Sequence, residues 1–143
     1  MSVTSFNRST IFRVFGLIVA LGIVIGSVLP GAVLVSFRLV NSQLEHFVGY
    51  MLLSALAGLI GPGKKTLTLT AVLLTMMAGG LELIQILVPG RIPSFLDFLA
   101  SAGGAWAGTF LSAYSHLLFR AVGKLGNPVR PTREDVPSAD SDL

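Results

Sequence analysis

Apolar residues fall into four long runs along the chain, and short segments that carry Pro and Gly separate them. The runs extend over residues 11–29, 44–60, 66–88 and 95–119. Because an α-helix rises about 1.5 Å per residue, about 20 apolar residues cross a hydrocarbon layer of about 30 Å. Pro and Gly at 30–31, 61–63 and 89–90 are expected to end the helices. The pattern predicts an all-α membrane protein, a bundle of four transmembrane helices.

Composition supports this prediction. Of the 143 residues, 52% are hydrophobic and 12% are charged, whereas a globular domain has about 25% charged residues. A water-soluble domain of this composition would lack polar surface, so we set soluble folds aside. The chain has no cysteine, which excludes disulfides, thiolate metal sites and cysteine nucleophiles. The net charge of +3 is interpreted as a topology signal, and no nucleic-acid partner is expected.

Basic residues lie almost entirely on one side of the predicted membrane. The other side has only Arg38 and Arg91. The basic side is expected to carry Arg8, Arg13, Lys64, Lys65, Arg120, Lys124, Arg130 and Arg133. Because basic residues are retained in the cytoplasm, both termini are predicted to be cytoplasmic, in a multi-pass protein of the inner (plasma) membrane of a bacterium. The loops at 31–43 and 89–93 then face outward.

The chain is predicted to divide into a transmembrane domain, residues 1–125, and a tail, residues 126–143. The tail is polar and Pro-containing and is expected to be a disordered cytoplasmic segment, because it has too little apolar surface to fold alone. Arg8 and Arg13 lie at the N-terminal end of the first apolar run, so a cleaved signal peptide is an alternative interpretation of it.

Polar residues gather near the outer ends of the predicted helices. Glu82 lies six residues before Val88, hence about 9 Å below the predicted helix end, where an ionised carboxylate is costly without a partner. Glu82 and Gln85 share a helix face, as do His46 and Tyr50, and the two stripes could meet between helices. The candidate ligand-binding residues are His46, Tyr50, Glu82, Gln85, Arg91 and Asp97.

These residues carry a resemblance to a known family. Glu82-Leu-Ile-Gln85, then Pro89-Gly90-Arg91, then Asp97 before a Gly-rich helix resembles the signature of the VanZ-like family. The segment from His46 to Tyr50 is similar to that family's second-helix motif, although Glu45 and Ser101 stand where the family often has a basic residue and Asn. The resemblance implies a small integral membrane protein, and a founding member is linked to teicoplanin resistance. It implies no settled catalytic mechanism.

Several of these residues also have structural interpretations. Ser94-x-x-Asp97 fits a helix capping box, and Arg91 could pair with Glu82, with Asp97 or with a lipid phosphate. His46 could equally be a hydrogen-bonded residue at a helix end. A stripe of small residues is expected to let another helix approach closely and offers a face for a homo-oligomer. The stripe consists of Ala100, Gly104, Gly108 and Ser112.

Three classes of function remain open at this stage. The first is binding of membrane lipids, with an envelope-lipid or precursor headgroup held at the outward-facing polar site, which would affect teicoplanin-type susceptibility. The second is an enzyme that modifies such a lipid, and the third is a proton-coupled carrier or a structural membrane subunit. His46, Glu82 and Asp97 could offer three metal ligands, but no local metal-binding motif accompanies them. The sequence therefore predicts no metal and no cofactor.

Overall fold

The computed structural model describes residues 7–35, 41–61 and 63–125, and its regular structure there is entirely helical. The helices are α1 (Arg8–Val28), α2 (Gly31–Val35), α3 (Ser42–Ile60), α4 (Lys64–Gln85) and α5 (Phe95–Leu125). The predicted tail, residues 126–143, lies outside the described residues, as does Arg38.

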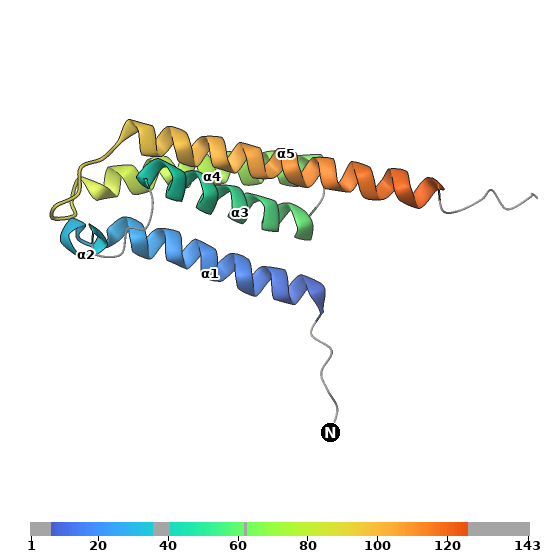
Figure 1. The fold of residues 1–143 in the computed structure, drawn as a ribbon, viewed down its shortest axis with the longest axis horizontal. Coiled ribbons are helices and arrows are strands. Elements are labelled where there is room, and N and C mark those ends of the chain that lie inside the picture. The colour runs from blue at the N-terminus through green and yellow to red at the C-terminus, as the bar shows by residue number, and fades with distance from the viewer. Residues whose placement is uncertain (1–6, 36–40, 62, 126–143) are drawn as a thin grey trace, which may run out of the picture.

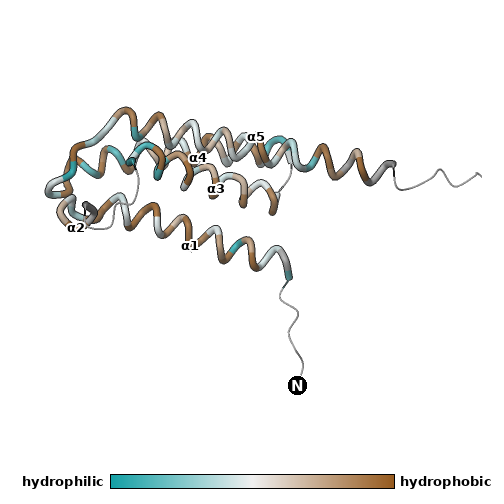
Figure 2. Tube along the Cα trace, viewed as in Figure 1, coloured by the Kyte–Doolittle hydropathy of each residue, from teal (hydrophilic) through white to brown (hydrophobic). Residues whose placement is uncertain are grey.

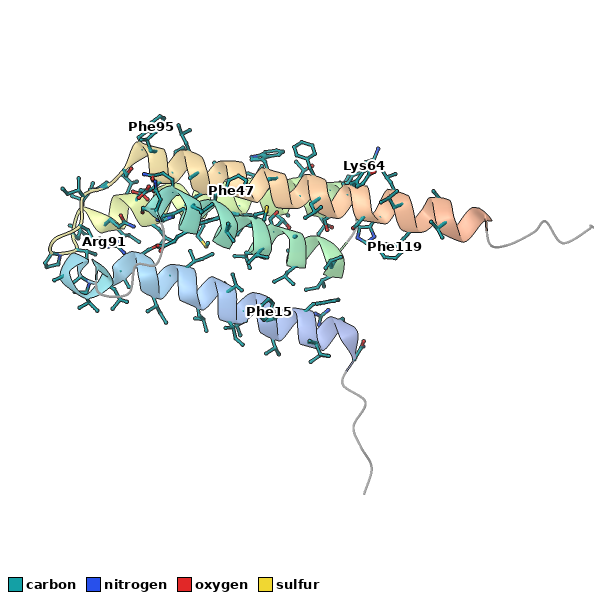
Figure 3. All side chains as sticks on the ribbon, viewed as in Figure 1. Phe15, Phe47, Lys64, Arg91, Phe95 and Phe119 are labelled. Atoms are coloured by element: carbon teal, nitrogen blue, oxygen red, sulfur yellow. The ribbon has the colours of Figure 1, made fainter. Side chains whose placement is uncertain are left out.

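The four long helices run alternately up and down, so that each is antiparallel to the next long helix (Figure 1). α3, α4 and α5 form a packed group, and α1 lies along α3 and contacts α4 less extensively. One end of the bundle collects the end of α1, the start of α3, the end of α4 and the start of α5 (Figure 1). Arg91 lies at this end and Lys64 at the other (Figure 3). This agrees with the prediction that the two residues lie on opposite sides.

Three helices in the described residues, α1, α3 and α4, are long and apolar enough to cross a membrane. They match three of the four predicted spans. The fourth predicted span corresponds to α5, which is 31 residues long and carries Asp97 in its first turn. These three helices identify a multi-pass membrane protein.

The distribution of polarity is the reverse of that in a soluble protein. The most buried side chains are small or polar, such as Ser54, Ala71 and Ala105 at 0% exposure. Large apolar side chains such as Leu83 and Phe110 are 68% exposed. Apolar residues, drawn in brown, recur along all four long helices (Figure 2). Such a surface suits lipid, where helices associate through small residues and buried hydrogen bonds.

Two glycines of α5 allow α3 to pack directly on its backbone. A Cβ at Gly104 would collide with the carbonyl of Phe47, and a Cβ at Gly108 with the carbonyl of Met51. The predicted close approach of a helix to this stripe is therefore confirmed, and the helix is α3 of the same chain. Association of two chains through the same face, for which α3 would have to move away, stays a prediction.

Buried hydroxyls reinforce the contact between α3 and α5. Thr109 Oγ1 donates to the Ala105 carbonyl at 3.0 Å, so Ser54 Oγ, 2.8 Å away, donates to Thr109 Oγ1. His116, to which the sequence assigned no function, lies 3.1 Å from the Gly58 carbonyl through Nε2. These bonds satisfy polar groups for which lipid tails offer no hydrogen-bond partner, and they fix the register of the two helices.

The helix bounds differ from the prediction at several places. α1 begins three residues earlier than predicted, at Arg8, and α5 ends at Leu125 rather than at residue 119. α4 ends at Gln85 rather than at Val88. Ile86, Leu87 and Val88 form a tight turn, in which each backbone amide donates to the carbonyl three positions earlier. The apolar run continues through this turn, although the α-helix does not. Glu82 is therefore three residues from the end of α4, about 4.5 Å rather than 9 Å. The short helix α2 was not predicted.

The turn between α4 and α5 also relies on glycine. Gly90 has φ +72°, a left-handed conformation that glycine adopts without steric cost. A Cβ at Gly31 would collide with the Gly90 carbonyl, and the Gly31 amide donates to the Pro89 carbonyl at 3.2 Å. The turn is thereby fastened to the start of α2, close to the polar end of the bundle.

Candidate functional site

The polar site lies at the end of the bundle where α3 and α5 begin and α4 ends. Asp97, in the first turn of α5, accepts a hydrogen bond from Ser42 Oγ through Oδ2 at 2.8 Å. The same carboxylate oxygen is 3.9 Å from Nε2 of His46. The first turns of α3 and α5 therefore present their polar side chains to each other.

Ser101 sets the orientation of the His46 imidazole. Ser101 Oγ donates its proton to the Asp97 carbonyl at 2.8 Å, one turn back along α5. Its oxygen also lies 3.0 Å from His46 Nδ1, and with the hydroxyl proton already used it can only accept there. Nδ1 of His46 therefore carries a proton, and Nε2 is the ring nitrogen that lies near Asp97.

Half of the predicted capping box is present at the start of α5. Ser94 Oγ accepts from the Asp97 amide at 3.2 Å, as a helix cap does. The reciprocal bond of a capping box is replaced, because the Ser94 amide donates to Glu82 Oε2 at 2.8 Å. Glu82 thus caps the neighbouring helix, and the Asp97 carboxylate turns toward Ser42 and His46 instead.

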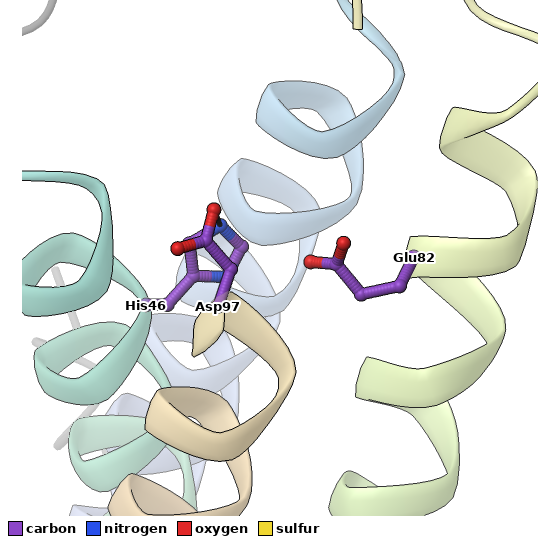
Figure 4. A group of neighbouring side chains, drawn as sticks. All are labelled: His46, Glu82 and Asp97. Atoms are coloured by element: carbon purple, nitrogen blue, oxygen red, sulfur yellow. Dashed lines mark ion pairs between the residues drawn. The ribbon is translucent and has the colours of Figure 1, made fainter. Parts of the chain in front are cut away.

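The three ionisable groups of the site come from three different helices. One ligand atom each of His46, Glu82 and Asp97 lies within 4.8 Å of the other two. Figure 4 shows the Glu82 carboxylate directed from α4 toward His46 and Asp97. The predicted meeting of the two polar stripes is confirmed for these residues. A nitrogen and two carboxylates at such distances are groups that could hold a divalent metal ion.

Arg91 is fixed against the end of α1. Its Nε donates to the Leu29 carbonyl at 3.1 Å, and its Nη2 donates to the Gly26 carbonyl. The last carbonyls of a helix have no partner within the helix and carry partial negative charge, so a guanidinium is favourable there. Arg91 therefore joins the α4–α5 turn to α1.

A cavity of about 280 Å³ lies between α1 and α3 at this end of the bundle. Its α1 wall is apolar or small, and its other wall carries polar groups. The polar and charged residues that line it are Ser27, Ser42, Glu45, His46, Tyr50 and Arg91. The cavity thus offers one basic side chain, one acidic side chain, an imidazole and a phenol to whatever enters it.

The remaining predicted site residues take different places. Tyr50 lines the cavity and is 1% exposed. Gln85 is 3% exposed, and its Nε2 is buried with no hydrogen-bond partner in the described part of the chain. Gln85 shares the Glu82 face of α4 but is not among the residues that line the cavity.

The structure adds three polar residues that were not among the candidates. Ser42 binds Asp97, Ser101 orients His46, and Glu45 lines the cavity. The position of Ser101 four residues after Asp97 places both on one face of α5, and that spacing could have identified it. Ser42 precedes the predicted start of its helix, and only the fold places it beside Asp97.

Comparison of the chain with family models, curated proteins and solved structures finds no match. The VanZ-like resemblance therefore rests on the residues quoted for it.

Proposed function

We propose that the chain is a VanZ-like protein of the bacterial inner membrane, in which an outward-facing polar site binds the phosphate-bearing headgroup of an envelope lipid or lipid-linked precursor. In this proposal α1, α3, α4 and α5 all cross the membrane, and both termini are cytoplasmic. The 31 residues of α5 correspond to about 46 Å, more than a hydrocarbon layer requires. The exposed Lys64 and Lys65 begin α4 on the cytoplasmic side, as the positive-inside rule favours.

The observation that carries the proposal is the cavity beside Arg91. A guanidinium is suited to phosphate because its N–H groups form a planar fork. Bonds to the α1 carbonyls already hold Arg91 in place, so little further side-chain entropy is lost when an anion binds. Glu45, which also lines the cavity, suits a hydroxyl or ammonium group of the same headgroup.

The surroundings of the cavity suit a lipid rather than a free solute. The α1 side of the cavity includes the apolar side chains of Val19 and Ile23. An acyl chain could follow this surface while its headgroup enters the polar end. The resemblance implies a further consequence, a change in susceptibility to teicoplanin-type antibiotics through altered presentation of an envelope ligand.

Native mass spectrometry of the purified protein tests this proposal. We compare lipids retained by the wild type, Arg91→Gln and the matched control Lys64→Gln, which removes a charge at the opposite end. A charge-assisted bond contributes about 1.5–3 kcal/mol, so Arg91→Gln is expected to weaken retention about 10- to 100-fold. Lys64→Gln should retain the wild-type lipid.

The comparison requires that both variants are folded, which helicity and thermal unfolding establish. Gln is chosen because its amide NH2 group retains two N–H donors in place of the guanidinium donors. A folded Arg91→Gln variant that retains the lipid as well as the wild type contradicts the proposal. Equal losses in both variants contradict it too, because they would indicate general attraction between basic residues and anionic lipid.

A further inference from the structure

The charges of the three-helix cluster are not balanced by the protein groups that form it. His46, Glu82 and Asp97 place two carboxylates and an imidazole within 4.8 Å of one another. Asp97 Oδ1 is buried and has no hydrogen-bond partner in the described part of the chain. Glu82 is only 8% exposed. Two ionised carboxylates so close together repel each other strongly where water is scarce, and a cation between them removes that cost.

The imidazole is oriented so that Nε2 can act as a metal ligand. Nδ1 of His46 is hydrogen-bonded to Ser101 Oγ, so Nε2, on the side of Asp97, is the nitrogen available to bind a cation. Nε2 lies 3.9 Å from Asp97 Oδ2, which is longer than a hydrogen bond, so the two atoms are not bonded directly. A metal-bound histidine characteristically donates its other N–H to a fixed acceptor, and Ser101 provides one.

The carboxylates are held by neighbouring donors in the same way. Asp97 Oδ2 accepts from Ser42 Oγ at 2.8 Å, and Glu82 Oε2 accepts from the Ser94 amide at 2.8 Å. A carboxylate has several lone pairs, so each can keep its donor and also ligate a cation. Ordered hydrogen bonds of this kind orient the carboxylate ligands of metal sites.

From this geometry we infer that His46, Glu82 and Asp97 bind one divalent first-row transition-metal ion, of which zinc is the representative. One imidazole nitrogen and two carboxylates suit such an ion, whereas Mg²⁺ and Ca²⁺ prefer oxygen ligands alone. Ligand bonds of about 2.1 Å place tetrahedral ligand atoms about 3.4 Å apart. The 3.9 Å separation of His46 and Asp97 is close to this, and a Glu82 carboxylate oxygen lies within 4.8 Å of both ligand atoms.

Three protein ligands leave a fourth coordination position for water or another ligand. His46 also lines the cavity beside α1, so the ion would lie at the cavity's inner wall. The inference departs from the sequence-based expectation of no metal, and it does not depend on the lipid proposal.

The test is zinc binding by the full chain in detergent. The protein is treated with a chelator and then titrated with Zn²⁺, and the metal content is measured by mass spectrometry after removal of free ion. We expect one zinc per chain and no comparable binding of Mg²⁺. His46→Gln, Glu82→Gln and Asp97→Asn should each lose at least the 10- to 100-fold in affinity that follows loss of a ligand's hydrogen-bond partner.

A matched control comes from the same chain. His116→Gln removes the other histidine, whose Nε2 lies beside the Gly58 carbonyl rather than in the cluster, and should bind zinc as the wild type does. X-ray absorption of the zinc-loaded wild type should show one imidazole with the remaining ligands oxygen, which keeps the inference testable if a ligand variant does not fold. No stoichiometric zinc in the wild type, loss of zinc in the His116→Gln control, or an absorption spectrum without imidazole overturns the inference.

Discussion

The backbone contact between α3 and α5 yields a prediction with an internal control. A Cβ added at Gly104 would lie 2.9 Å from the Phe47 carbonyl carbon and 3.1 Å from the Met51 nitrogen. Carbon atoms pack best at about 3.5–4.0 Å, and the Phe47 carbonyl oxygen lies closer still, so α3 must withdraw by at least roughly 0.6–1 Å. The obstacle is helix backbone, which cannot rotate away as a side chain can.

The neighbouring glycine provides the control. A Cβ at Gly103 would lie 3.7 Å from the Phe47 ring, which is ordinary contact, and Gly80 has nothing within 4 Å of its Cβ position. We expect Gly104→Ala to lower the free energy of unfolding by about 1–3 kcal/mol, the cost of overpacking. Gly103→Ala and Gly80→Ala should be neutral or stabilising, because Ala favours helix over Gly by about 0.8–1.0 kcal/mol.

The assay is unfolding of the protein in mixed micelles, followed by helicity and by the fluorescence of Trp106. A withdrawal of α3 would also separate His46 from Ser101, whose side-chain atoms are 3.0 Å apart, so Gly104→Ala should weaken binding at the polar site as well. If Gly104→Ala and Gly103→Ala change the free energy of unfolding equally, α3 does not contact the α5 backbone as described.

Three further predictions concern the site, the packing and the topology. Ser101→Ala removes the acceptor of the imidazole Nδ1–H, so zinc affinity should fall about 10- to 100-fold in a titration monitored by metal content, and unchanged affinity would contradict the assigned tautomer. Ser54→Ala removes a buried bond to Thr109 and should cost about 0.6 kcal/mol, at most about 1.7 kcal/mol, in the same unfolding assay; a larger loss would mean that Ser54 does more than donate this bond. Because the chain has no cysteine, Ile92→Cys should react with an impermeant maleimide from outside the cell and Lys65→Cys only after the cells are opened, and the reverse pattern would refute the orientation.

Much of the fold could be predicted from the sequence because hydropathy reports the environment of a whole helix. α3 begins at Ser42 and ends at Ile60, within two residues of the predicted 44–60. The end of α4 was misplaced because Ile86, Leu87 and Val88 are apolar in either conformation, and hydropathy does not distinguish a helix from a tight turn. The short helix α2 was missed because its five residues are too few to show a helical repeat of apolar positions.

The candidate site could be predicted only in part. Glu82, which shares a helix face with Gln85, and His46 could be identified as candidates on two different helices, because polar groups in a predicted membrane span need partners. The tautomer of His46 could not be inferred, because it depends on the rotation of Ser101 across a helix contact. A site assembled from three helices also has no local metal-binding spacing, which is why no motif indicated one.

Photo-crosslinking in vesicles tests whether a lipid headgroup binds at the polar end of the bundle. The protein is reconstituted with a phospholipid that carries a photoreactive group in its headgroup, and the labelled peptides are identified after illumination. We expect labelling of the segment that contains Glu45 and His46 and of the end of α1, with loss of that labelling in Arg91→Gln but not in Lys64→Gln. Uniform labelling along the helices, or labelling confined to the Lys64 end, would contradict it.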